Sequence, residues 1–127
     1  MVNFSNNAVF NLSPIREDQI QETVRNLFVN GESIIGAYKT IRDQVIFTNK
    51  RIITIDVQGI TGKRKDFSTL PYSKIQYFSV QTPGFAELVP DCEMELYFTN
   101  GFVAKFEFKG NCNIIELGKI ISGYVLE

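Results

Sequence analysis

The sequence predicts a mainly β domain (α+β by content): a small barrel of seven antiparallel strands, closed by a C-terminal helix and preceded by an N-terminal helix. Apolar residues recur at helical spacing near both ends of the chain, and between them β-branched and aromatic residues alternate with polar ones over short runs. A length of 127 residues, with 44% hydrophobic and 21% charged side chains, fits one folded domain. We therefore expect a single hydrophobic core.

The chain is divided into a short N-terminal segment and a domain. Residues 1–12 carry no periodic pattern and are a candidate for disorder, whereas residues 13–127 are expected to form the domain. The first residues also lack the basic stretch and apolar run of a secretory signal peptide, so a cytoplasmic protein is expected. No run approaches the ~18 consecutive apolar residues of a membrane-spanning helix.

The first helix is predicted over residues 14–30. One face carries apolar residues at spacings i, i+4, i+7 and i+8, namely Ile20, Val24, Leu27 and Phe28. Ser13 is the expected N-cap, and Gly31 supplies the left-handed stop. Because the C-terminal helix already closes the barrel, this stripe is surplus apolar surface that must cover either the chain's own barrel wall or another subunit.

The barrel is predicted over residues 33–109. Its strands are expected at about 33–41, 44–48, 51–57, 63–69, 75–82, 92–99 and 102–109. Residues 48–51 fit a tight hairpin turn, and Asn100-Gly101 fits a two-residue type I′ turn. Short connections of this kind are typical of an antiparallel barrel.

Alternation along the strands predicts which side chains are buried. In the third strand the core face is expected to hold Ile53, Ile55 and Val57. The last strand is expected to bury Phe102, Ala104, Phe106 and Phe108. Glu and Lys residues on the opposite face of the last hairpin are expected to pair across strands, which gives these charges a structural role.

The closing helix is predicted over residues 112–125, with Asn111 as an available N-cap. Its apolar stripe consists of Leu117, Ile120, Ile121 and Tyr124. We expect this stripe to plug the open end of the barrel.

Three segments are recognisable: FTNKRIITID at 47–56, QGITGKRK at 58–65 and LPYSKI at 70–75. Together with the order of elements, they resemble the bacterial pleckstrin-homology (PH) domains over about residues 30–125. The resemblance implies a PH-like barrel and, because members of that family tend to form ring-like homo-oligomers, self-association. The motifs lie in strands and turns, so they indicate a fold more than a mechanism.

Composition restricts the chemistry. The chain has no His and only two Cys, Cys92 and Cys112, so catalytic triads that contain His and zinc sites built from His and Cys are unavailable. We predict no enzyme activity, no cofactor and no metal site. A net charge of −1 provides no global attraction to nucleic acid. The two thiols are interpreted as buried apolar groups, although the hairpin register leaves a disulfide between them open.

Two surfaces are candidate sites. The densest cation cluster is Lys63, Arg64 and Lys65, a candidate contact for anionic lipid, within a stretch (39–74) of eight basic and three acidic residues. The loop that PH domains elsewhere use for phosphoinositide head groups offers here only Lys39 and Arg42, offset by Asp43. The candidate protein interface joins the first helix to an unusually long loop (82–91) and comprises Ile20, Val24, Phe28, Phe85 and Leu88.

We therefore predict a non-enzymatic PH-like interaction or oligomerisation module. Its partner is a further protein or the chain itself, as a homo-oligomer of more than two subunits. The alternative is peripheral binding to anionic lipid head groups through the basic loop.

Overall fold

The computed structural model describes residues 8–82, 92–109 and 113–127. Its strands are β1 (Ala8–Pro14), β2 (Ile34–Lys39), β3 (Gln44–Thr48), β4 (Arg51–Gln58), β5 (Arg64–Pro71), β6 (Ile75–Gln81), β7 (Cys92–Phe98) and β8 (Val103–Phe108). Its helices are the short 3-10 turns η1 (Glu17–Gln19) and η2 (Tyr72–Lys74), the single turn α1 (Thr23–Asn26) and the long α2 (Ile114–Val125). All seven predicted strands and the closing helix are confirmed, with ends that shift by one or two residues.

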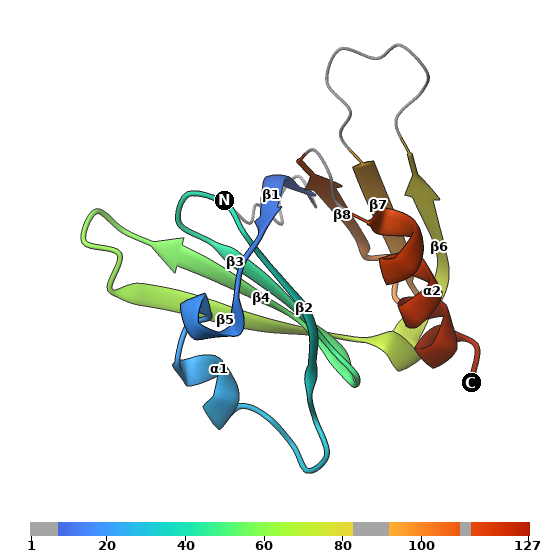
Figure 1. Cartoon of the computed structure of the whole chain (residues 1–127), viewed down its shortest axis with the longest axis horizontal. Helices are drawn as coiled ribbons and strands as arrows, with labels where there is room; N and C mark the ends of the chain where they lie inside the picture. The colour runs from blue at the N-terminus through green and yellow to red at the C-terminus, as the bar shows by residue number, and fades with distance from the viewer. Residues whose placement is uncertain (1–7, 83–91, 110–112) are drawn as a thin grey trace.

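The strands form one curved sheet in the order β5-β4-β3-β2-β1-β8-β7-β6. Figure 1 shows two antiparallel halves, β2 to β5 and β6 to β8, with β1 between them. β1 runs antiparallel to β2 and parallel to β8, so it completes the wall. β5 and β6 are neighbours along the chain but are not paired, because the corner η2 turns the chain from one half to the other. The barrel wall is therefore open between β5 and β6.

The barrel interior is the main core and is largely aromatic. Phe47, Phe106 and Phe108 are fully buried there, and their rings meet at tilted or edge-on angles. α2 covers one end through a buried stripe of Ile114, Leu117 and Ile121, and Tyr124 stacks on Tyr72 at the corner. The predictions of an aromatic inner face and of a plugging helix are confirmed.

A second apolar layer lies outside the barrel, on the outer face of the β2–β4 half. Ile53, Ile55 and Val57 of β4 are buried in it, while Ile52 of the same strand points into the barrel. The prediction that Ile53, Ile55 and Val57 are buried is therefore right, but their side chains pack outside the barrel. β4 is buried on both faces because the segment between β1 and β2 covers its outer face.

The predicted helix over residues 14–30 is wrong, and this covering segment takes its place. Ser13 and Pro14 end β1, and the segment then makes only η1 and α1, separated by Ile20 in extended conformation (φ −72°, ψ 141°). The side chain of Gln44 replaces helical hydrogen bonds, because its Oε1 accepts from the Gln21 N–H (2.9 Å) and its Nε2 donates to the Gln19 carbonyl (2.9 Å). Packing against the sheet thus overrides the helical spacing.

The N-terminal boundary is also corrected. Residues 8–12, a candidate for disorder, belong to β1, so a domain boundary at residue 13 would cut a strand. Asn11 has a positive φ of 58° at an irregularity in the pairing with β8, and the next residue, Leu12, is buried in the barrel core. Residues 1–7 lie outside the described residues.

The last hairpin has a register one residue away from the prediction. β7 and β8 pair Tyr97 with Val103, and the Phe98 N–H donates to the Phe102 carbonyl at 2.8 Å. The loop therefore has three residues, with Gly101 at φ 91°, and is not a two-residue type I′ turn. The predicted cross-strand charge pairs are confirmed, since the Lys105 Nζ lies 3.4 Å from a Glu95 carboxylate oxygen.

The N-cap of the closing helix is corrected by two residues. Asn113 is the cap, and its side chain accepts a hydrogen bond from the Glu116 N–H at 3.2 Å. The predicted cap, Asn111, lies outside the described residues. The capping chemistry is as expected, at the next asparagine along the chain.

Candidate functional site at the loop end of the barrel

Two loops meet at the end of the sheet remote from the corner η2: the β2–β3 loop (40–43) and the β4–β5 loop (59–63). Arg42 joins them, because its Nη2 donates to the Gly59 carbonyl at 2.5 Å. Asp43 is buried and turned inward, where its Oδ1 accepts from the Val57 N–H at 2.8 Å. The carboxylate expected to offset the cations of this loop is therefore committed to a buried backbone contact.

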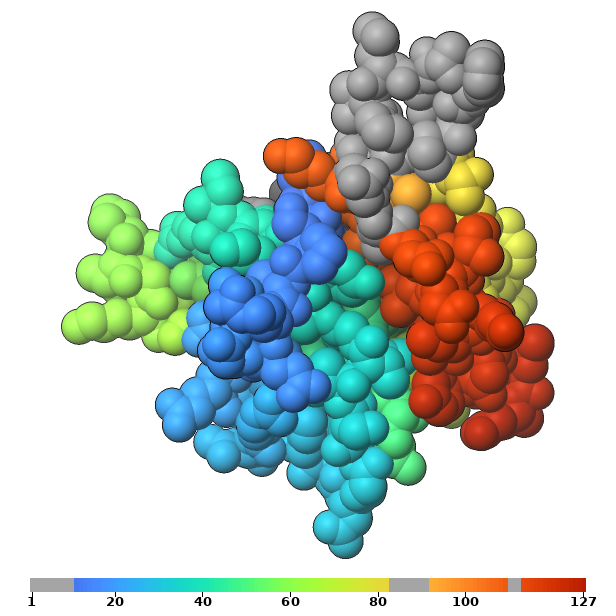
Figure 2. Space-filling model, viewed as in Figure 1, coloured from blue at the N-terminus to red at the C-terminus, as the bar shows by residue number. Residues whose placement is uncertain are grey.

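Each of the two loops carries a fully exposed isoleucine. The fractional exposure of Ile41 is 101% and that of Ile60 is 105%, the two highest among the large exposed apolar residues of the described chain. Gly59 and Gly62, with φ of 80° and 68°, form the turn that presents Ile60. Figure 2 shows the β4–β5 end (yellow-green, at the left) projecting from the body of the molecule.

Five cations lie on the same two loops and on the adjoining ends of β2 and β5. The side chains of Lys39, Arg42, Lys63, Arg64 and Lys65 are all exposed. Among the described residues, none of the five has a carboxylate oxygen within 4.0 Å. The candidate lipid contacts therefore lie at the same end of the domain as the two exposed isoleucines. Sequence reasoning missed Ile41 and Ile60, although an isoleucine in the turn sequence Gly-Ile-Thr-Gly was a usable signal.

The candidate protein interface is placed differently. Ile20 and Val24 are buried in the outer apolar layer, and the half-buried Phe28 packs against it. The apolar stripe Ile20, Val24, Leu27 and Phe28 was expected to cover either the chain's own barrel wall or another subunit. The structure shows that it covers the chain's own barrel wall. Phe85 and Leu88 lie outside the described residues.

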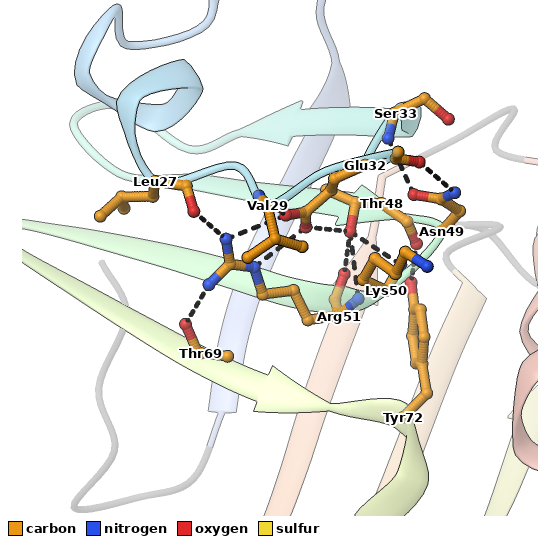
Figure 3. Close-up of polar contacts among 11 residues, drawn as sticks. Leu27, Val29, Glu32, Ser33, Thr48, Asn49, Lys50, Arg51, Thr69 and Tyr72 are labelled. Atoms are coloured by element: carbon orange, nitrogen blue, oxygen red, sulfur yellow. Dashed lines mark hydrogen bonds and ion pairs between the residues drawn. The ribbon is translucent and has the colours of Figure 1, made fainter.

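A buried ion pair holds the covering segment to the β3–β4 turn (Figure 3). The Glu32 side chain is fully buried, and its Oε2 accepts from Arg51 Nε (2.9 Å) and the Thr48 hydroxyl (2.6 Å). Its Oε1 accepts from Arg51 Nη2 and the Val29 N–H, both at 3.0 Å. Arg51 is 15% exposed and also bonds to the Leu27 carbonyl. Both carboxylate oxygens are thus occupied, which assigns the pair a structural role.

The same turn supplies further contacts. The Asn49 side chain accepts from the Ser33 N–H at 2.8 Å and donates to the Gly31 carbonyl at 2.9 Å. The Tyr72 hydroxyl donates to the Thr48 carbonyl at 2.7 Å, which ties the corner to the turn. The FTNKR part of the recognised motif is therefore a set of structural contacts that close one end of the domain.

Electrostatics support that role. Burial raises the pKa of Glu32, but hydrogen bonds from Arg51, Thr48 and Val29, together with the charge of Arg51, outweigh it and leave the pKa below its ordinary value. Glu32 is therefore ionised and paired at neutral pH. Nothing in the sequence indicated that Glu32 pairs with Arg51, which lies 19 residues later.

Three other expectations concern metals, thiols and membranes. In the described parts of the chain no group of three or more His, Cys, Asp or Glu side chains is arranged to hold a metal ion. Cys92 is buried in β7, and Cys112 lies outside the described residues, so the disulfide question stays open. Within the described ranges no helix has the length and apolar character that crossing a membrane requires.

Comparisons with known proteins agree with this architecture. The model of the bacterial PH domain family matches residues 3–125. The uncharacterized protein YjqA of Bacillus subtilis (strain 168) is 34% identical over 122 residues, 94% of this chain and 95% of that protein.

Solved structures give the same result. A DUF1696 family protein with a pleckstrin-homology domain from Shewanella loihica PV-4 aligns with a TM-score of 0.77 and 30% identity, over 92% of this chain and 99% of that one. The pleckstrin-homology domain from Shewanella amazonensis SB2B aligns with a TM-score of 0.61 and 32% identity, over 82% of this chain and 83% of that one. The predicted PH-like fold is confirmed, and the chain belongs to the bacterial pleckstrin-homology domain family.

Proposed function

We propose that this domain is a non-enzymatic binding module whose loop end attaches to an anionic lipid surface. One observation carries the proposal: two fully exposed isoleucines lie on two loops joined by Arg42, and five exposed cations lie on the same loops and the adjoining strand ends. Apolar side chains that enter the interfacial region, combined with cations that meet anionic head groups, are the two signals that peripheral membrane binding needs.

The magnitudes fit a reversible attachment. Each cation near an anionic surface contributes about 1 kcal/mol, and full burial of an isoleucine contributes roughly 1.5–3 kcal/mol. The loss of translational and rotational freedom on binding opposes these terms by at least about 4 kcal/mol. Either signal alone exceeds this cost by at most about 1–2 kcal/mol, which corresponds to binding weaker than millimolar. Measurable binding should therefore require both the cations and the isoleucines and should weaken as salt screens the charges.

Vesicle sedimentation tests the proposal. Wild-type protein should co-sediment with phosphatidylglycerol-containing vesicles at low salt, and much less at high salt or with pure phosphatidylcholine. The variant Lys63→Ala/Arg64→Ala/Lys65→Ala should bind at least tenfold more weakly, because it removes three of the five cations. A matched control, Lys50→Ala/Lys74→Ala/Lys119→Ala, removes the same charge from exposed positions elsewhere. Equal losses in both variants would show a net-charge effect and would contradict a site at the loop end.

Self-association stays a prediction. The apolar stripe Ile20, Val24, Leu27 and Phe28, one of its supports, is used within the chain, since Ile20 and Val24 are buried there. Two supports remain: the family resemblance and the outer edge of β6, which ends the sheet at the open side of the barrel across from β5. Light scattering at micromolar concentration checks the prediction: we expect a mass of more than twice 14.5 kDa, whereas a constant mass near 14.5 kDa would reject it.

A further inference from the structure

A concave surface lies at the end of β5 opposite the loop end, where the two halves of the sheet separate. It is a pocket of about 620 Å³ between the last four residues of β5 and the β7–β8 turn. Its lining contains both apolar and polar residues: Ser68, Thr69, Leu70, Pro71, Lys74, Phe98, Thr99, Asn100 and Phe102. Its volume is typical of ligand-binding pockets.

The far wall of this pocket is fixed. The Thr99 N–H donates to the Lys74 carbonyl at 2.9 Å, which holds the β7–β8 turn against η2. The rings of Phe98 and Phe102 lie 5.8 Å apart and form the apolar part of the wall together with the nearly buried Leu70. The pocket therefore belongs to the folded framework and does not need a ligand to form.

The near wall is the outer edge of β5. β4 is its only strand neighbour in the described sheet, and no described backbone group pairs with the outer side of β5. Alternate N–H and C=O groups of such an edge are available to an added strand. This edge thus offers main-chain hydrogen bonds directly beside an apolar pocket.

Charge is distributed unevenly along this edge. Its first three residues, Arg64, Lys65 and Asp66, are all charged and exposed, the pattern by which proteins protect strand edges against pairing. The remaining five residues (67–71) carry no charge. The only charged side chain that lines the pocket is the exposed Lys74, with no lining carboxylate to neutralise it. The uncharged half of the edge therefore lies beside a single cation that no lining carboxylate neutralises.

We propose that this half-edge and pocket bind an extended acidic peptide of another protein, which adds to β5 as a further strand. A bulky apolar side chain of the peptide enters the pocket between Leu70 and Phe102, and a carboxylate near it pairs with Lys74. The alternating side chains of an extended strand allow one residue to face the pocket while its neighbours face solvent. The site is separate from the loop end and does not depend on the lipid proposal.

A second copy of this chain fits the edge less well. Antiparallel pairing of two β5 strands about a two-fold axis would bring Lys63, Arg64 and Lys65 of one copy toward Lys74 of the other, which is a repulsion of like charges. An acidic peptide replaces this repulsion with attraction. The observations therefore favour a peptide over a symmetric β5 dimer.

A phage-displayed library of linear eight-residue peptides is a suitable probe for the full chain. Enriched peptides should share an acidic and a bulky apolar residue. A fluorescein-labelled synthetic copy of the strongest binder should then bind Lys74→Glu at least tenfold more weakly, and Lys50→Glu, a matched reversal of an exposed lysine on the β3–β4 turn, within twofold of wild type. Phe102→Ala provides a second variant and should also weaken binding, with its fold verified by circular dichroism.

Strand addition has its own test. N-methylation of alternate backbone amides in the same peptide should abolish binding, and the unmodified peptide should slow amide exchange in residues 67–71. The proposal is overturned if no peptide is enriched over uncoated beads, or if Lys74→Glu leaves the affinity unchanged. It is also overturned if the methylated peptide binds as tightly as the unmodified one. A further contradiction would be a homo-oligomer that does not bind the peptide and that Lys74→Glu dissociates in light scattering, because the edge would then bind a second copy of the chain.

Discussion

The two ends of the β4–β5 hairpin use arginine in opposite ways. At the corner end, Arg51 begins β4 largely buried, with its guanidinium hydrogen-bonded to Glu32, Thr69 and the Leu27 carbonyl. At the loop end, Arg64 begins β5 as an exposed residue beside Lys63 and Lys65. The comparison teaches that a cation in this domain is structural where the chain supplies its partners, and available for a ligand where it does not.

The largest effect should come from breaking the corner. Arg51→Met leaves the buried Glu32 carboxylate without its cation and should lower the free energy of unfolding by about 3 kcal/mol. Arg64→Met, which removes an exposed cation at the loop end, should change it by less than about 0.5 kcal/mol. Urea unfolding measures both; similar losses would show that the two ends do not differ in this way.

A smaller loss is expected at Thr48. Its hydroxyl donates to Glu32 and accepts from the N–H groups of Lys50 and Arg51 at 3.1 and 3.0 Å. Thr48→Val keeps the shape of the side chain but removes the acceptor of these two N–H groups and one of the donors to Glu32, at a cost of about 1–2 kcal/mol. Thermal unfolding of the variant should show this loss, while vesicle binding by the loop end should stay at the wild-type level.

Acid should reduce the difference between wild type and Arg51→Met. The pKa of Glu32 is lowered in the folded state, so its contribution to stability is present above its ordinary value of about 4.5 and is lost as the pH falls through the folded value. Arg51→Met already lacks this contribution. The gap in unfolding free energy between the two proteins should therefore be wide at pH 7 and narrow toward pH 3. A gap that stays constant over this range would contradict the ion pair.

Substitution of the exposed cations at the loop end should hardly change the stability of the domain. Lys63→Ala/Arg64→Ala/Lys65→Ala changes only exposed side chains without described carboxylate partners, so its free energy of unfolding should stay within about 0.5 kcal/mol of wild type. A loss above 1 kcal/mol would mean that these cations serve the fold, and the contrast with Arg51 would disappear.

Strands β2 to β8 and the closing helix were predictable because local signals agree with the final packing, whereas β1 was not predicted. Period-2 alternation, the turns and the apolar stripe of residues 114–121 all favour the observed elements. The covering segment was not predictable in the same way. Its apolar spacing is helical, yet Gln44, which lies 23 residues after Gln21, takes up its backbone hydrogen bonds.

The candidate site was only half predictable. The three consecutive cations Lys63, Arg64 and Lys65 are visible in the sequence, but the inward turn of Asp43 and the joining of the two isoleucine-bearing loops by Arg42 depend on contacts between residues far apart in the sequence. The Glu32–Arg51 pair depends on a contact across 19 residues. Such long-range pairings are set by the register of the sheet and leave no local trace.

The most direct test of the central claim uses the absence of tryptophan from this chain. Ile60→Trp places a single fluorophore at the loop end, and Leu126→Trp places one at an exposed apolar position just after α2. With vesicles that contain phosphatidylglycerol, the emission of Ile60→Trp should shift to shorter wavelength and be quenched by brominated lipid, while that of Leu126→Trp should not change. An unchanged spectrum for Ile60→Trp, or a shift only for Leu126→Trp, would contradict attachment through the loop end.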